Sequence, residues 1–126
     1  MAENKSNTEM AISFLKLAAS GNVDEAYSKC VDPTFKHHNQ YFKGDRESLI
    51  LAMKESSIKM PNRTFDVKMI IEEGDIVVTY SHNRIHNSDL EIAVVHIMKF
   101  KNNRIVELWD VGQPISKDSP NVNGMF

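Results

Sequence analysis

The sequence predicts an α+β fold in which three helices come first and a curved antiparallel sheet follows. In the first 60 residues, apolar side chains recur every three to four positions, as they do along one face of a helix. From residue 65 onward they alternate with polar ones, which is the period of a strand. Helices followed by consecutive strands are typical of the α+β class, and 126 residues suit one domain spanning 1–126.

The first half of the chain carries three sets of helix start and stop signals. A capping box opens two of the helices and an aspartate opens the third. Glycine or proline then closes each segment. The predicted helices, with their start and stop residues, are 8–20 (Ser6, Glu9, Gly21), 23–30 (Asn22, Glu25, Pro33) and 46–59 (Asp45, Pro61).

The second half is predicted to form four strands joined by polar turns. Valine, isoleucine, threonine and aromatic residues are concentrated in these segments, and Gly, Asn, Asp and Ser separate them. The predicted strands are 65–72, 76–85, 92–101 and 105–111, with a short extended piece near residue 35 before the third helix. Residues 116–126 have no period and are expected to form an irregular tail, and about residues 1–5 to be disordered.

Composition narrows the function classes. Net charge is −2 with Lys and Arg dispersed, so we expect no nucleic-acid partner. No apolar run approaches a membrane span, and the N-terminus has no apolar signal-peptide region, so a cytoplasmic protein is expected. The lone Cys30 excludes an internal disulfide and a multi-cysteine metal site, and it is expected to be a core thiol. No metal and no cofactor are predicted.

The last hairpin decides which polar groups share a face. A two-residue loop at Asn102 and Asn103 would set His96 on the face away from Asp110. A three-residue loop, with Asn103 in the left-handed region, would pair Met98 with Val106 and set His96 and Asp110 on one face. We predict the second register because it separates polar from apolar side chains better.

In this register the two faces of the hairpin differ in content. A histidine and a carboxylate share an otherwise apolar wall, and the other face is too apolar to be left in water. Because the helices can cover only one side of the sheet, the second face is expected to meet another subunit in a homodimer. The first face carries Val94, His96, Met98, Phe100, Val106, Leu108 and Asp110, and the second carries Ala93, Val95, Ile97, Ile105 and Trp109.

Asp110 ends an apolar row, where an ionised carboxylate is unfavourable unless it is paired or hydrogen-bonded. One interpretation is a strand-end cap that faces solvent or accepts backbone N–H groups. The other is a pocket acid/base whose protonation is tuned by burial. Each histidine, taken alone, is more often structural than catalytic; His37 and His38 fit a surface pair and His86 a solvated turn.

Two segments resemble the SnoaL-like proteins of the nuclear transport factor 2-like superfamily. The first runs from Phe35 through His38-Asn39 to Gly44 and Leu49, and it is similar to their "aromatic-x-x-His-Asn … Gly-x-x-x-Leu" stretch, with four residues in place of three between Gly44 and Leu49. The second is the last hairpin, 95–110. The resemblance implies a cone-shaped, strongly bent, mixed or antiparallel sheet whose wide end is closed by three N-terminal helices around a pocket. The chain departs from the pattern at Gln40, where many relatives have proline.

The resemblance also implies site residues. In cyclases of this group the aspartate of the last strand acts as acid/base in an intramolecular aldol closure, and a histidine of the preceding strand lies beside it. By position these are Asp110 and His96, and His38 would line the same pocket. The remaining pocket residues expected to contact a substrate are His82, Tyr80, Asn39, Tyr41 and Met98.

Three functions fit this reading. The first is a cofactor-independent cyclase, isomerase or lyase that moves a proton next to the carbonyl group of a small hydrophobic compound. The second is a binding module with the same pocket and no turnover. The third is an interaction domain that dimerises through the outer sheet face at Trp109, Ile97 and Val95. Proton exchange on a bound carbonyl compound separates the first from the second.

Overall fold

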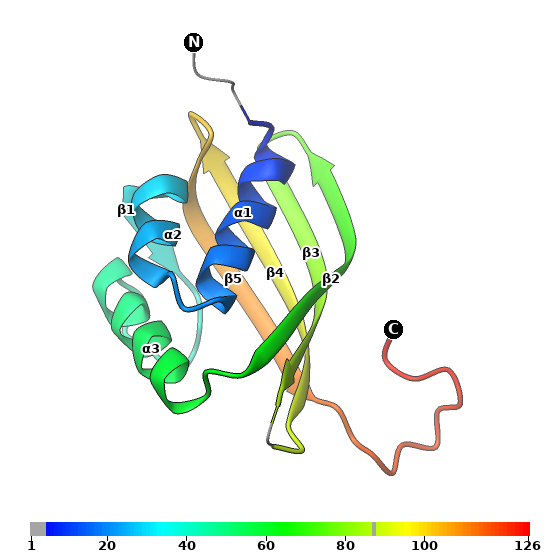
Figure 1. Ribbon diagram of the computed structural model, residues 1–126. Coiled ribbons are helices and arrows are strands. Elements are labelled where there is room, and N and C mark those ends of the chain that lie inside the picture. The colour runs from blue at the N-terminus through cyan, green and yellow to red at the C-terminus, as the bar shows by residue number, and fades with distance from the viewer. Residues whose placement is uncertain (1–4, 87) are drawn as a thin grey trace.

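The computed structural model describes residues 5–86 and 88–126 and has the α+β layout expected (Figure 1). Three helices come before four of the five strands, as the change of period predicted. In chain order the elements are α1 (Asn7–Ala19), α2 (Val23–Cys30), β1 (Val31–His37), α3 (Arg46–Lys59), β2 (Arg63–Glu73), β3 (Ile76–Ile85), β4 (Glu91–Lys101) and β5 (Arg104–Pro114).

The five strands form one mixed sheet in the order β1-β5-β4-β3-β2. Strands β2 to β5 are antiparallel neighbours, and β1 joins the far side of β5 in parallel. The sheet is bent, and the helices lie on one side of it, with α1 across β3–β5 (Figure 1). The helices and the concave side of the sheet therefore enclose a space, as the cone predicted from the resemblance requires.

The helix start signals act largely as predicted. Ser6 and Glu9 form the capping box of α1, and Asp45 accepts the backbone N–H of Ser48 at the start of α3. Asn22 is an exception because its side chain makes no capping bond and instead donates to Ser20 Oγ. The start of α2 thus depends on its packing and its acidic first turn rather than on a side-chain cap.

The core lies between the helices and the concave face of the sheet. Tyr27 of α2 is at its centre, with the Phe14 ring at 5.4 Å and the Phe35 ring at 6.0 Å, both packed edge to face. These three rings join α1, α2 and β1. Cys30 is buried in the same cluster, as expected, and burial raises the pKa of its thiol.

The predicted register of the last hairpin is wrong by two residues, although the face is right. The loop has two residues, Asn102 and Asn103, and both have positive φ (52° and 64°), as a type I′ turn requires. A β-bulge between Lys99 and Phe100 then shifts the pairing by one residue. His96 consequently lies directly opposite Asp110, where the prediction set Val94.

The bulge also changes the predicted faces near the turn. Ile105 pairs with Phe100 and is fully buried in the core, so the prediction that it belongs to the outer face is wrong. Val106, predicted to face inward, is only partly buried. The alternation of inward and outward side chains is interrupted at the bulge. Beyond it, every second residue counted from Asp110 therefore no longer lies on the face of Asp110.

The C-terminal segment is an irregular tail whose last two residues contact the outer face of the sheet. Tyr80 donates its hydroxyl hydrogen to the carbonyl oxygen of Met125, and the Phe126 ring stacks 4.6 Å from the His82 ring. The tail therefore covers part of the outer face beside β3. The expected disorder at residues 1–5 falls almost wholly outside the described residues.

We predict that Asn102→Val lowers the free energy of unfolding by at least about 1 kcal/mol. A left-handed backbone costs a residue with a Cβ roughly 1–2 kcal/mol, and asparagine tolerates it better than a β-branched residue does. The matched control is Lys101→Val, at the exposed strand position next to the turn. Urea unfolding followed by circular dichroism measures both, and equal stability of the two variants would contradict the turn assignment.

Candidate active site

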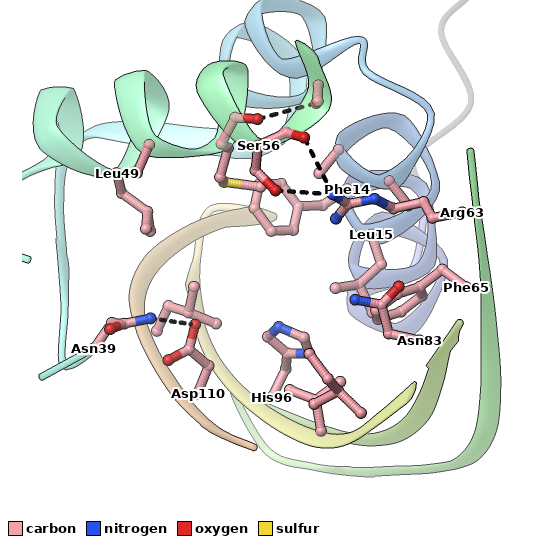
Figure 2. Close-up of a pocket in the computed structure, with 18 of the residues that line it drawn as sticks. Phe14, Leu15, Asn39, Leu49, Ser56, Arg63, Phe65, Asn83, His96 and Asp110 are labelled. Carbon is pink, nitrogen blue, oxygen red and sulfur yellow. Dashed lines mark hydrogen bonds between the residues drawn. The ribbon is translucent and has the colours of Figure 1, made fainter. Parts of the chain in front are cut away.

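A cavity of about 320 Å³ lies between the helices and the bent sheet. Its wall is mostly apolar, with a few polar groups that come from four different strands and two other segments (Figure 2). Sites for small molecules commonly have this composition. The lining residues are Phe14, Leu15, Ala18, Ala19, Asn39, Phe42, Leu49, Ala52, Met53, Ser56, Ser57, Arg63, Phe65, Asn83, Ile92, Val94, His96, Leu108 and Asp110.

His96 and Asp110 are brought together in this cavity by strand pairing. They are direct partners across β4 and β5, so their side chains leave the sheet on the same face. Directly opposed residues of an antiparallel pair have Cβ atoms about 4.5–5.5 Å apart. Figure 2 shows the imidazole and the carboxylate side by side on the floor of the cavity. A small ligand can therefore contact both groups at once.

Asn39 orients the Asp110 carboxylate. Its Nδ2 donates to Asp110 Oδ2 at 3.2 Å, while its Oδ1 accepts the backbone N–H of Tyr41 at 3.0 Å. The bond from Tyr41 fixes which end of the amide faces Asp110, because the carbonyl oxygen is already in use. The second carboxylate oxygen, Oδ1, accepts no hydrogen bond from the described residues and is free for a ligand.

His96 is held as a neutral imidazole. Burial lowers the pKa of His96, and the nearby Asp110 carboxylate opposes that shift less strongly. Its Nδ1 is buried with no hydrogen-bond partner among the described residues. A neutral imidazole carries one N–H, so His96 can donate to a ligand oxygen without carrying a full charge.

A row of polar side chains lies on the inward face of β3, and only its last member, Asn83, lines the cavity. Thr79 is the strand partner of His96, and Ser81 and Asn83 follow on the same face. Within the described residues, Thr79 Oγ1, Ser81 Oγ and Asn83 Oδ1 are buried and have no hydrogen-bond partner. Buried polar atoms are nearly always hydrogen-bonded in native proteins, so the unpaired Oδ1 of Asn83 favours a polar occupant beside it.

His38 does not line the cavity, contrary to the expectation from the resemblance. Its Nε2 lies 2.5 Å from Glu107 Oε2, and its ring stacks 4.9 Å from Trp109 on the outer face. The reason is the parallel pairing of β1 with β5, in which His37 is opposite the inward-facing Leu108. His38, the next residue, must then point outward. His37 is buried but is not among the lining residues.

Four of the five predicted substrate contacts also lie away from the cavity wall. Tyr80 and His82 are on the outer face of β3 against the tail, and His82 Nε2 lies 2.7 Å from Glu91. Tyr41 is 79% exposed, and Met98 is fully buried in the core. Only Asn39 of this group lines the cavity, where it binds Asp110.

Several lining residues were missed from the sequence. Phe14 lies on the predicted apolar stripe of the first helix, so its place could have been inferred from the helix period. Asn83 was missed because the prediction turned Tyr80 and His82, on the other face of the same strand, toward the pocket. Arg63 had no such signal, because it follows the Pro61 stop of α3 and begins a strand that was predicted to start two residues later. No cluster of three or more metal-ligating side chains occurs in residues 5–86 and 88–126.

The same fold occurs in solved structures of proposed polyketide cyclases. IdmH from Streptomyces antibioticus, a proposed polyketide cyclase, superposes with a TM-score of 0.75 at 18% identity, covering 86% of this chain and 93% of that chain. A proposed SnoaL-like polyketide cyclase from Jannaschia sp. CCS1 gives 0.73 at 12% identity, covering 89% and 92%. An NTF2-like protein of unknown function from Cytophaga hutchinsonii gives 0.71 at 17%, covering 90% and 95%.

At these identities the likeness establishes the fold, which is that of the SnoaL-like and NTF2-like proteins, as the sequence resemblance indicated. No protein-family model and no curated protein sequence matches this chain. Among the described residues, none of the helices combines the length and the apolar character needed to span a bilayer.

We predict that the stabilising contribution of neutral His96 is lost as the pH falls. The folded pKa of His96 is lowered, so the unfolded chain, whose histidine pKa is about 6.5, takes up the proton first. Wild-type stability should therefore fall below about pH 6.5, by at most roughly 1.4 kcal/mol per pH unit for this one proton.

The measurement is urea unfolding of the wild type and His96→Gln at pH 7.5, 6.5 and 5.5. The other four histidines are common to both proteins, so their contributions cancel in the difference. We expect any advantage of the wild type to shrink as the pH falls. A difference that stays constant would show that His96 titrates alike in the folded and unfolded chains.

Proposed function

We propose that this chain is a cofactor-independent enzyme that moves a proton at the carbon next to a carbonyl group, as in cyclisation by aldol condensation, isomerisation or dehydration. The pairing of His96 with Asp110 at the floor of a mostly apolar cavity is the observation that carries the proposal. The fold shared with proposed polyketide cyclases supports it.

In this mechanism Asp110 is the base. Its Oδ1, which is free of hydrogen bonds within the described chain, takes the α-proton, while Asn39 holds Oδ2 in place. The C–H electron pair moves into the carbonyl group and gives an enolate. Protonated Asp110 then returns the proton to carbon in an isomerisation, or to the alkoxide that forms when the enolate attacks a second carbonyl in an aldol closure.

His96 stabilises the enolate oxygen. The neutral imidazole donates its N–H to the oxygen on which negative charge develops, from a position fixed by β4. Because burial lowers the pKa of His96, it remains a hydrogen-bond donor and does not become a competing acid at neutral pH. Phe65, 6.1 Å from the His96 ring, and the other apolar lining residues shield the reacting atoms from water.

We predict that Asp110→Asn folds normally and lowers the rate of α-proton exchange at least about 100-fold, the usual contribution of a positioned base. The assay is ¹H NMR in heavy water with a panel of neutral and carboxylate-bearing aryl ketones. Asparagine keeps the size of the side chain and can still accept from Asn39, so the fold should not suffer.

The matched control is Asp66→Asn, which removes an exposed carboxylate of β2 that does not line the cavity. It should exchange at the wild-type rate. Full exchange in a folded Asp110→Asn protein would place the base elsewhere. Binding of ketones by the wild type with no exchange at all would favour the binding module over the enzyme.

The outer sheet face is proposed to form a homodimer contact. Val95, Ile97 and Trp109 are only partly buried there, and Val111 is 68% exposed, beyond the part that the tail covers. Removing each such side chain from water is worth roughly 1.5–3 kcal/mol when burial is complete. A two-fold contact buries this strip of side chains, Val95, Ile97, Trp109 and Val111, on both copies at once. The Trp109–His38 stack lies at or near the edge of the proposed contact.

We predict a dimer by sedimentation at micromolar concentration, and its dissociation by Ile97→Lys. A charge at the centre of the strip would be buried without a partner. The control is Val122→Lys, which changes a 96% exposed tail residue and should leave the dimer intact. A wild-type monomer near 14.4 kDa would contradict the dimer and show that this face is covered only by the tail or is left in water.

A further inference from the structure

The cavity contains a cation that the proposed proton transfer does not use. Arg63, at the start of β2, is partly buried and lines the cavity with Phe14 and Phe65. Among the described residues it forms no ion pair with an Asp or Glu side chain, although six Lys and Arg side chains form such pairs elsewhere in residues 5–86 and 88–126. A guanidinium facing an apolar cavity is unfavourable unless something pairs with it.

The protein holds this guanidinium in place by one nitrogen only. Nη2 donates to Ser56 Oγ at 2.8 Å and, at 3.4 Å, to the carbonyl oxygens of Ser56 and Met60 at the end of α3. Nη1 and Nε donate to none of the described residues. The anchor therefore fixes the plane of the group and leaves its other N–H donors unused, which is an arrangement suited to a planar oxyanion.

The remaining polar groups fix how an anion would lie. Arg63 and Ser56 are across the cavity from Asp110 and His96, and Asn83 lies between them (Figure 2). Asp110 would repel an anionic group at the floor, whereas Arg63 would attract it at the opposite side. Asn83, whose Oδ1 is buried without a partner in the described chain, supplies a further polar contact along the way.

We infer that the substrate is an organic acid, a carbonyl compound that also carries a carboxylate, bound with the carboxylate on Arg63 and the carbonyl group on His96 and Asp110. This inference rests on the proposed function for the place of the carbonyl group. One guanidinium, with no lysine among the lining residues, matches a single negative charge better than a phosphate dianion. Asp110 excludes the reversed orientation, which makes the site directional.

The test compares binding of an acid with that of its uncharged isostere. The probes are 4-oxo-4-phenylbutanoate and 4-oxo-4-phenylbutanamide, together with the homologous pairs that have one methylene fewer or more. They are titrated calorimetrically into the wild type, Arg63→Gln, Arg63→Lys and the control Arg84→Gln. Arg84 is an exposed arginine of β3 that does not line the cavity, so its variant makes the same change in net charge.

For at least one pair, the wild type should bind the acid about tenfold or more tightly than the amide, as expected for charge-assisted hydrogen bonds. Arg63→Gln should reduce that ratio to within about twofold while changing amide affinity little. Arg63→Lys should keep part of the preference for the acid, because lysine supplies the positive charge without the two parallel N–H donors of a guanidinium. Arg84→Gln should behave as the wild type.

The inference is overturned if acid and amide bind the wild type equally, if Arg63→Gln keeps the wild-type ratio, or if no acid of the series binds at millimolar concentration. The wild-type ratio needs no variant, and Arg63→Lys keeps the charge, so a folding defect in Arg63→Gln does not by itself decide the result. Proton exchange is scored separately. Acid-selective binding without exchange defeats the proposed function alone, and exchange without selectivity defeats this inference alone.

Discussion

The β-bulge between Lys99 and Phe100 governs the content of the cavity. Asn102 and Asn103 close the hairpin in a two-residue turn, and an unbroken ladder from that turn would place His96 and Asp110 on opposite faces. One extra residue restores their common face, and the same shift turns Ile105 into the core. The placement of His96 beside Asp110 and the burial of Ile105 therefore both depend on this one bulge.

The pairing of the parallel edge strand β1 with β5 determines which residue orients Asp110. Lys36 pairs with Glu107 and His37 with Leu108. The chain continues alongside β5 in the same register, so that Asn39 reaches Asp110 and hydrogen-bonds to it. The carboxylate is therefore oriented by a residue 71 positions earlier in the chain. The same offset turns His38 outward against Trp109, where it contributes to the outer face and not to the chemistry.

The cavity contains few polar groups, and they lie in separate places. His96 and Asp110 occupy the floor, Asn83 lines the wall on the neighbouring strand β3, and Arg63 occupies the far side near the end of α3. Apolar side chains from α1, α3 and the strands fill the space between them. A ligand with two unlike polar ends would satisfy both places at once, which a uniformly apolar ligand cannot do.

The sequence by itself determined the helices, the four long strands and the fold class. These follow from local periods and caps, such as Ser6 with Glu9 and Asp45, whose physics acts within a few residues. It did not determine the bulge, the side of His38, or the place of Arg63. Those depend on pairing between distant strands and on the packing of α3 against β2. Such pairing is set by the fit of whole surfaces, and no short stretch of sequence encodes it.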